Sequence, residues 1–249
     1  MEITIPKTST VFSALLRADL TTLWRNRRSS LLALIVPLMI LISWKGLVAK
    51  LGGAFVMSNC ITIGLVAIGL MGYTNSIARD RDKGIFQRLR VAPVPSWCIM
   101  MSRIVVQLLM ISVMTLLIFI IGYKFDEIIL PVSNYIFMYM MTLVGGAVYL
   151  ALGQVIVGRI KNPETVNSTT RLVYFAFIMI GMFGELGMLG SQLKQVTHWS
   201  PYGTVRTILA VGAKPELWSM DTTNSLLATI AYTILFAFLG IKWFKWNTK

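Results

Sequence analysis

The sequence predicts an all-α polytopic membrane protein with six transmembrane helices, and three observations support this fold class. Hydrophobic residues make up 56% of the 249 residues, and the mean hydropathy is +0.72. Only 13% of the residues are charged, whereas a soluble domain carries about twice that share. Apolar runs of about 18 residues or more, long enough to cross a bilayer as a helix, recur along the chain.

The N-terminal region, residues 1–28, precedes the first apolar run. Within it, residues 10–27 have the periodicity of an amphipathic helix. The apolar positions Phe12, Leu16, Leu20, Leu23 and Trp24 share one face, whereas Arg17, Thr21 and Arg25 lie away from it. Asp19 interrupts the apolar face. We expect this helix to lie in the headgroup layer of the membrane as an interfacial elbow helix.

The transmembrane domain comprises residues 29–249, and its six spans are predicted at 29–48, 54–77, 101–122, 132–157, 172–190 and 222–241. Pro37 is expected to kink the first span. The connections at 49–53, 123–131 and 158–171 are short, the connection at 78–100 is charged, and the connection at 191–221 is long and mostly polar.

The distribution of basic residues predicts the orientation of the chain. Six spans place both termini on one side, and that side holds seventeen Lys and Arg against five acidic residues. The opposite side holds six basic and five acidic residues. Because basic loops stay in the cytoplasm, both termini are predicted to be cytoplasmic. The seven tryptophans all fall at predicted interfaces or in the outer loop, as in the aromatic belts of membrane proteins.

The charged connection between spans 2 and 3 is unusual in this apolar chain. Residues 78–90 hold seven charged side chains, which would cost about 20 kcal/mol at the centre of a membrane. The stretch therefore lies at the cytoplasmic surface, where Ile85, Phe86 and Leu89 recur at helical spacing and Gly84 favours a turn. One interpretation is a plain basic anchor that fixes topology. The other is a surface helix whose exposed apolar face docks a soluble partner.

The stretch SIARDRDKGIFQRLRVAPVPSWCIMMSRI resembles the segment after the second span of ABC-2 type transporter permeases. The residues that match the family's pattern in order and spacing are Arg79, Asp80, Arg81, Asp82, Lys83, Gly84, Arg88, Leu89, Ala92, Pro93 and Val94. The sequence departs from the pattern with Asp at 80 and 82 in place of Glu, Ile85 in place of Thr, and Phe86-Gln87 in place of Leu-Glu. The predicted six spans, cytoplasmic termini and elbow helix also agree with the family.

The resemblance implies a partnership with other subunits. Two six-span subunits, identical or related, form the pore, and two separate ATP-binding subunits dock beneath them. The segment 79–90 is then the coupling helix, with the candidate coupling residues Arg79, Asp80, Arg81, Asp82, Lys83, Gly84, Ile85, Phe86, Gln87, Arg88 and Leu89. Residues 187–221 correspond to the family's extracellular hairpin. The sequence contains no GxxxxGK[ST] motif, so ATP and Mg are expected on the partner chain and no cofactor on this one.

Two groups of residues are candidates for the translocation path. Asn59, Thr62 and Tyr73 share a face of span 2 with Gly69. This face is expected either to look into the translocation path or to pack against another helix through internal hydrogen bonds. Phe175, Met179, Met182 and Phe183 in span 5 offer adaptable apolar contacts. Ordinary lipid-facing or packing positions are the alternative, and such residues favour that interpretation.

Together these features predict the permease subunit of a bacterial ATP-driven exporter. It is expected in the inner membrane, in contact with membrane lipids. Its expected substrate is amphipathic or hydrophobic, such as a drug, an antimicrobial or toxin peptide, or a lipid-linked molecule. No nucleic-acid partner is expected, because the basic residues follow the membrane topology. An integral membrane enzyme acting on lipids, or a passive channel or scaffold, is the alternative. One histidine, two distant cysteines and scattered acidic residues give no catalytic or metal-ligand cluster for such an enzyme.

Overall fold

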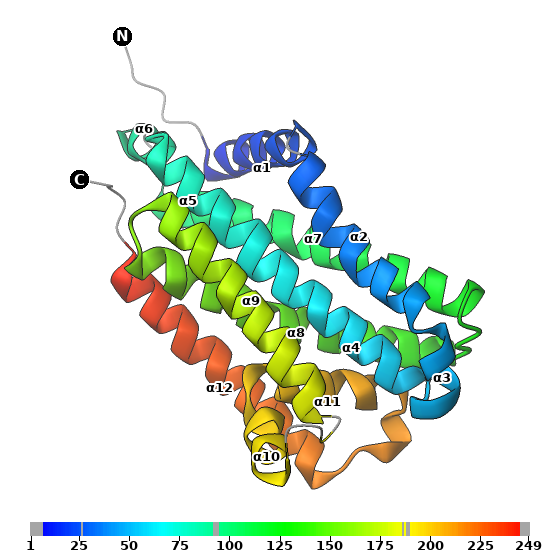
Figure 1. The fold of residues 1–249 in the computed structure, drawn as a ribbon. Helices are drawn as coiled ribbons and strands as arrows, with labels where there is room; N and C mark the ends of the chain where they lie inside the picture. The colour runs from blue at the N-terminus through cyan, green and yellow to red at the C-terminus, as the bar shows by residue number, and fades with distance from the viewer. Residues whose placement is uncertain (1–6, 26, 92–94, 186, 188–189, 245–249) are drawn as a thin grey trace.

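The computed structural model describes residues 7–25, 27–91, 95–185, 187 and 190–244, and these residues form helices joined by short turns. The terminal segments 1–6 and 245–249, and residues 188 and 189 of the predicted hairpin, lie outside this description. The long helices form one bundle (Figure 1). Helices α1 (Thr8–Arg25), α5 (Asn75–Asp82) and α6 (Ile85–Val91) lie at one end, here called the charged end, and α3 (Lys45–Leu51) and α10 (Ser191–Trp199) lie at the opposite end.

Five helical segments in the described part of the chain are long and apolar enough to cross a membrane, or six if a bent pair counts as one span. The first is continuous through α4 (Gly53–Val66), the π-helical segment η1 (Ala67–Thr74) and α5. The others are α7 (Ser96–Lys124), α8 (Val132–Arg159), α9 (Pro163–Glu185) and α12 (Met220–Trp243). The predicted all-α polytopic fold is confirmed.

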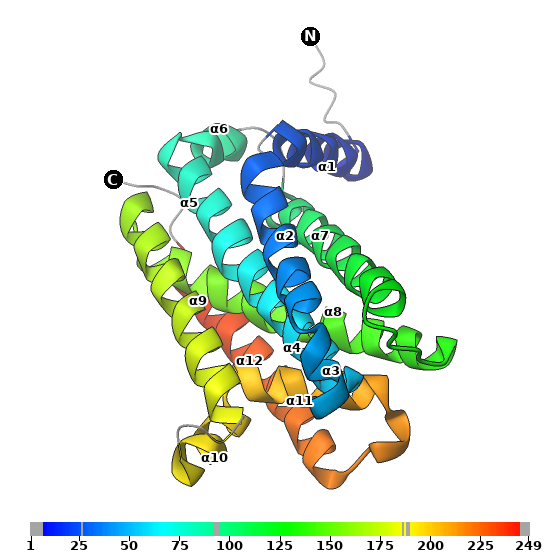
Figure 2. The ribbon, with the colours of Figure 1, turned by 45° about the vertical axis from the view of Figure 1, so that its right-hand side comes forward.

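The α4–η1–α5 helix is the centre of the bundle. Its most apolar window is 83% buried, whereas the corresponding windows of α9 and α12 are each 17% buried. Helices α7, α8 and α11 (Pro201–Ala213) pack against it, and α12 packs along α8 (Figure 2). The core therefore lies around the predicted second span, and α9 and α12 keep wide exposed faces.

The first span is bent, and the bend does not lie at Pro37. Helix α2 (Arg27–Ser43) contains Pro37, and the chain turns by 62° only between Ser43 and Lys45. Helix α3 then follows, with Trp44 between the two helices. The predicted span 29–48 is therefore broken near Trp44 and not kinked at Pro37, and its residues 45–48 belong to α3.

The fifth span begins nine residues before its predicted start at 172. Asn162 caps α9, because its Oδ1 accepts hydrogen bonds from the backbone N–H groups of Glu164 at 2.8 Å and Thr165 at 3.3 Å. Pro163 occupies the first helical position, where its missing N–H is not needed. Residues 163–171 were expected in a loop because they are polar, and this capping pair makes them helical.

The long polar connection between the fifth and sixth spans contains a buried helix. Helix α10 is exposed, but α11 packs against α4, α8 and α12 and buries Tyr202, Val205, Ile208 and Leu209. The Ser200 hydroxyl accepts a hydrogen bond from the Gly203 N–H and so caps α11. The expectation of a mostly polar outer segment is wrong for α11, because most of its residues are buried against the core.

Candidate functional site

The segment with the distinctive charge pattern forms a helix, a turn and a second helix at the charged end. Residues Arg79–Asp82 are the last turn of α5 and continue the central span. The chain turns at Lys83–Gly84, where Gly84 has a φ of +67°, and α6 follows. The left-handed backbone there favours glycine, which confirms the predicted turn. The predicted single helix over 79–90 is therefore two helices at an angle.

Arg81 fastens this segment to the rest of the bundle. Its side chain is fully buried, and its guanidinium donates hydrogen bonds to the carbonyl oxygens of Val157 (2.6 Å), Ile160 (2.6 Å) and Lys161 (3.0 Å). These carbonyls lie at the C-terminal end of α8, where helix carbonyls lack partners and the helix dipole is negative. A planar cation with several donors satisfies this end of the helix well.

The apolar side of α6 faces inward. Phe86 is completely buried, meets the ring of Phe244 edge-on at 6.0 Å, and lies beneath the Arg103 guanidinium at 5.4 Å. Ile85 and Leu89 are half-buried. The expectation that these residues form an exposed docking face is therefore wrong for Phe86. Phe244, which follows α12, and Arg103 of α7 cover the Phe86 ring. Packing within the protein itself therefore accounts for this apolar residue of α6.

The outward face of the segment is polar. The exposed residues between 79 and 89 are Arg79, Asp82, Lys83, Gln87 and Arg88. Arg81 and Phe86 hold this helix and turn against the bundle from the inside, and polar and charged side chains lie on the outside. The segment therefore presents a polar surface at the end of the central span.

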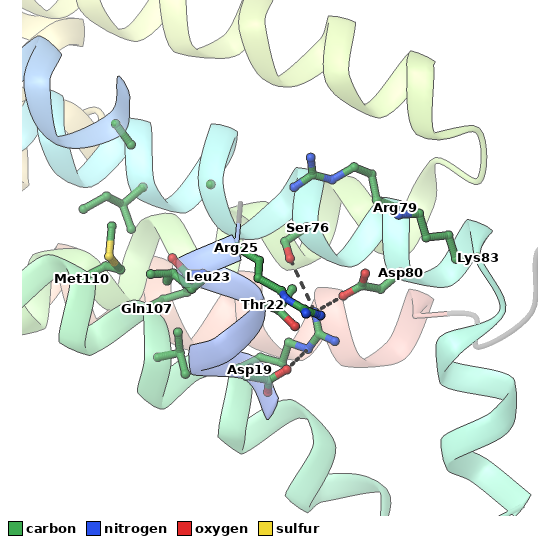
Figure 3. A pocket seen from close by; sticks show the side chains of 15 residues that line it. Asp19, Thr22, Leu23, Arg25, Ser76, Arg79, Asp80, Lys83, Gln107 and Met110 are labelled. Atoms are coloured by element: carbon green, nitrogen blue, oxygen red, sulfur yellow. Dashed lines mark hydrogen bonds and ion pairs between the residues drawn. The ribbon is translucent and has the colours of Figure 1, made fainter. Parts of the chain in front are cut away.

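Arg103 of α7 is the centre of a second set of contacts at this end, here called the Arg103 cluster (Asp19, Ser76, Asp80, Ser102 and Arg103). Arg103 pairs with Asp80 of α5 and, at 3.3 Å between Nε and Oδ1, with Asp19 of α1. It also contacts the Ser76 hydroxyl, and the Ser102 hydroxyl donates to Asp19 at 2.6 Å. In Figure 3 the dashed interactions of Asp19, Ser76 and Asp80 converge between these three labelled residues. The cluster joins the elbow helix, the charged segment and α7.

Asp19 is the residue that interrupts the apolar face of α1, and the Arg103 cluster explains it. Burial raises the pKa of the Asp19 carboxyl, and the neighbouring Arg103 guanidinium and the Ser102 hydrogen bond act in the opposite direction. The exposed side of α1 carries Leu20 and Trp24, whereas Leu15 and Leu23 pack toward the core. Helix α1 thus packs one side against the bundle, and its exposed side carries Leu20 and Trp24 together with Arg17 and Arg25.

The path candidates of the central span lie inside the bundle. Asn59, Thr62 and Tyr73 are buried. Asn59 Oδ1 accepts from the Tyr202 hydroxyl at 3.0 Å, Thr62 donates to the Ser58 carbonyl at 2.7 Å, and the Tyr73 hydroxyl donates to Gln154 Oε1 at 2.9 Å. The Asn59 and Tyr73 bonds correspond to the packing alternative, in which the polar face joins helices through internal hydrogen bonds, whereas the Thr62 bond lies within α4.

The path candidates on α9 lie apart from the buried set. Phe175 is 64% exposed, and Met179, Met182 and Phe183 are half-buried. They therefore remain available to lipid, to a second subunit or to a substrate. The structure does not bring the two candidate groups together around one cavity.

Sequence reasoning missed several residues that organise the structure. Arg103, Ser102 and Tyr202 come from segments read as ordinary span or loop, and their partners lie far away in sequence. The strongest available signal was Asp19, a carboxylate on an apolar face that needs a cation. Within the described ranges, no group of three His, Cys, Asp or Glu side chains is arranged to hold a metal ion.

Comparison with known proteins agrees with the fold class. A comparison with curated proteins finds no significant match. A family model described as ABC-2 family transporter protein matches residues 48–242, which span the central helix, the charged segment and the helices to the end of α12. Because the match covers most of the chain, the protein belongs to the ABC-2 transporter family and is the membrane permease component of an ABC transporter.

Proposed function

We propose that the protein is the permease subunit of an ATP-driven exporter, and that a separate ATPase subunit docks on the outward face of residues 79–89. The observation that carries the proposal is the two-sided construction of this segment. Arg81 and Phe86 hold it against α8, α7 and the end of α12, and Asp82, Lys83, Gln87 and Arg88 remain exposed. Movement of a docked partner is then passed to the central span.

In this proposal the charged end faces the cytoplasm and two permease subunits, identical or related, assemble with two ATPase subunits in the bacterial cell membrane. ATP and Mg belong to the partner. The exported substrate is amphipathic or hydrophobic, and the exposed apolar residues on α9 are available to it or to the second permease. The wide exposed faces of α9 and α12 leave room for such an assembly.

The coupling test uses the outward face of the segment, because Phe86 is needed for packing. The tagged chain is purified in mild detergent from the membranes of its own host, and the ATP hydrolysis of the purified complex is measured. We expect Gln87→Arg combined with Arg88→Glu to remove the ATPase from the complex. Arg17→Glu, an exposed change on α1, serves as the control and should retain it. A wild-type chain that purifies without any ATPase activity contradicts the proposal.

The direction of transport is tested separately. Inside-out membrane vesicles are supplied with ATP and a panel of fluorescent amphipathic dyes and peptides. An exporter accumulates its substrate inside these vesicles and does so only with ATP outside. Uptake into right-side-out vesicles, or uptake that is equal with and without ATP, rules out an ATP-driven exporter.

A further inference from the structure

The charged end contains a cavity of about 450 Å³ that the coupling proposal does not use. It lies between α1, α2, the η1–α5 part of the central span, and α7 (Figure 3). Its lining divides into a charged part and an apolar part. The charged part includes Arg25, Arg79, Lys83 and Arg103, and the apolar part includes Ile68, Val106 and Met110.

The charged part has an excess of cations. The two carboxylates of the lining, Asp19 and Asp80, are both paired with Arg103. Arg25 from α1 and Arg79 and Lys83 from the charged segment form no ion pair with other described residues, and all three are exposed. With the Arg103 cluster counted, the lining has a net charge of +2. Three cations around one opening suit an anion with several oxygen acceptors, such as a phosphate.

The apolar part continues from this opening into the bundle. Its lining here is formed by Ile68, Val106 and Met110, and by the half-buried Leu23 and Ala33. Water alone would leave such a surface poorly solvated, whereas a hydrocarbon chain would cover it. A ligand that satisfies both parts has an anionic head and an apolar tail.

The depth of the cavity in the membrane agrees with this chemistry. Helix α1 forms one wall and exposes Leu20 and Trp24 on its other side. A helix with exposed Leu and Trp and neighbouring basic residues lies at the boundary between headgroups and acyl chains. The cavity is therefore open at the level where the phosphates of membrane lipids lie.

We propose that this cavity is a binding site for a phosphate-bearing amphiphile, an anionic lipid of the leaflet at the charged end. Arg25, Arg79 and Lys83 bind the phosphate, and the acyl chain lies against Ile68, Val106 and Met110. The bound anion neutralises cations that come from both α1 and the charged segment, and so holds the elbow helix against the coupling segment. The site needs no ATPase partner.

The test measures lipid retention by the purified chain in neutral detergent, using native mass spectrometry. The chain is titrated with dioleoyl phosphatidylglycerol, with dioleoyl phosphatidylcholine, and with glycerol phosphate as the soluble form of the anionic head. We expect phosphatidylglycerol to bind in preference to phosphatidylcholine, and glycerol phosphate not to displace it. Arg79→Gln with Lys83→Gln should weaken phosphatidylglycerol binding at least about tenfold, through the loss of two cations.

Two further variants separate the site from general surface charge. Arg17→Gln with Lys161→Gln removes two exposed cations outside the cavity lining, and binding should then change by less than about twofold. Gly72→Leu keeps every charge but extends a side chain from the lining, where an added Cβ would find no neighbour closer than 3.7 Å. It should abolish retention of the lipid. Helical circular dichroism and gel filtration check that each variant is folded.

Three results would overturn the proposal. These are equal retention of the two lipids, equal losses in the Arg79/Lys83 and Arg17/Lys161 variants, and displacement of the lipid by glycerol phosphate at equal concentration. The last result would mean that the apolar part has no role and that the cavity takes a soluble anion. None of these measurements involves ATP, so their outcome is independent of the coupling test.

Discussion

Arg81 is one of the largest completely buried side chains in the described protein. A buried guanidinium is tolerated only where its donors find acceptors, and here three carbonyls at the end of α8 accept from it. The residue that resembles part of a coupling motif is therefore also a structural tie between α5 and α8. Its position explains why an arginine is needed at one specific place in a charged stretch.

Replacement of Arg81 should destabilise the protein. We expect Arg81→Ala to cost about 2–4 kcal/mol, because three carbonyls lose charged donors, and Arg81→Lys to cost less because one donor group remains near them. Thermal unfolding in detergent micelles, followed by circular dichroism, measures both. Arg88→Ala, on the exposed face, is the control and should change stability by less than about 0.5 kcal/mol. Equal unfolding temperatures for Arg81→Ala and Arg88→Ala would contradict this role.

Asp126 is a buried carboxylate at the opposite end of the bundle, between α7 and α8. It is 5% exposed, and neither side-chain oxygen has a hydrogen-bond partner among the described residues. Burial raises the pKa of the Asp126 carboxyl above its usual value, although Lys45 acts in the opposite direction. A raised pKa means that the folded state favours the protonated acid. Protonated Asp126 therefore contributes to the stability of the folded state at low pH. This contribution is lost as the pH rises through the pKa of Asp126 in the folded state.

The substitution Asp126→Asn should therefore stabilise the protein at neutral pH. The variant removes an ionisable group that must be buried as an unpaired anion, so its advantage grows as the pH rises above the ordinary aspartate range. Unfolding temperatures of both proteins, measured across acidic to neutral pH, give the difference directly. Glu127→Gln, at the exposed neighbouring position, is the matched control. A difference that does not change with pH would show that ionisation of Asp126 is not its cause.

Helix α11 shows how one element depends on contacts from several others. Tyr202 at its start donates to Asn59 of the central span, and Tyr149 of α8 donates to the Pro201 carbonyl at 3.1 Å. The Tyr202 ring also lies directly against Gly181 of α9. A side chain at 181 would occupy the position of this ring, so the close approach of α9 and α11 requires glycine there.

A single methyl group at Gly181 should separate these two helices. A Cβ at this position would lie 2.4 Å from a carbon of the Tyr202 ring, and we expect Gly181→Ala to cost about 1–3 kcal/mol by overpacking. Gly46→Ala in α3 is the matched control, because an added Cβ there has no neighbour within 4 Å. It should stabilise α3 slightly, by about 0.5–1 kcal/mol at most. Thermal unfolding distinguishes the two, and similar effects would contradict the contact.

At the scale of the whole molecule, the charges predict its orientation. The surplus of basic residues lies in the segments at the charged end, where α1, α5 and α6 are found (Figure 1). The opposite end has α3, α10 and the short helix η2 (Pro215–Leu217), with nearly balanced charge. This asymmetry favours a cytoplasmic position for the charged end.

Cysteine labelling in whole cells tests this orientation. Leu217→Cys and Arg17→Cys place exposed thiols at opposite ends, and the native Cys60 and Cys98 are buried and should react little. We expect a membrane-impermeant maleimide to label the cysteine at 217 in intact cells and the cysteine at 17 only after permeabilisation. The reverse pattern would invert the topology, and with it the proposed docking side.

The candidate site could be located from the sequence but not oriented. The charge pattern identified residues 79–89, and Gly84 marked the turn, because both signals are local. The inward face of Phe86 depends on Phe244 and Arg103, which are distant in sequence. An apolar stripe on a short helix has the same pattern whether it faces a partner or the protein's own core. The Asp19–Arg103 pair was unpredictable for the same reason, since several cations of the chain were equally plausible partners.

The sequence by itself determined the fold class, the order of the long apolar helices and the position of the charged segment. The hydrocarbon interior of a membrane excludes charged side chains, and each membrane-spanning helix must form its backbone hydrogen bonds within itself. These features therefore follow from the composition of each segment alone. Only the tertiary structure decided where the first span bends, that α11 enters the core, which side of α6 is exposed, and that α1, α5 and α7 enclose a cavity. Each of these depends on the shape and the hydrogen-bonding groups of residues that meet only after the helices have packed.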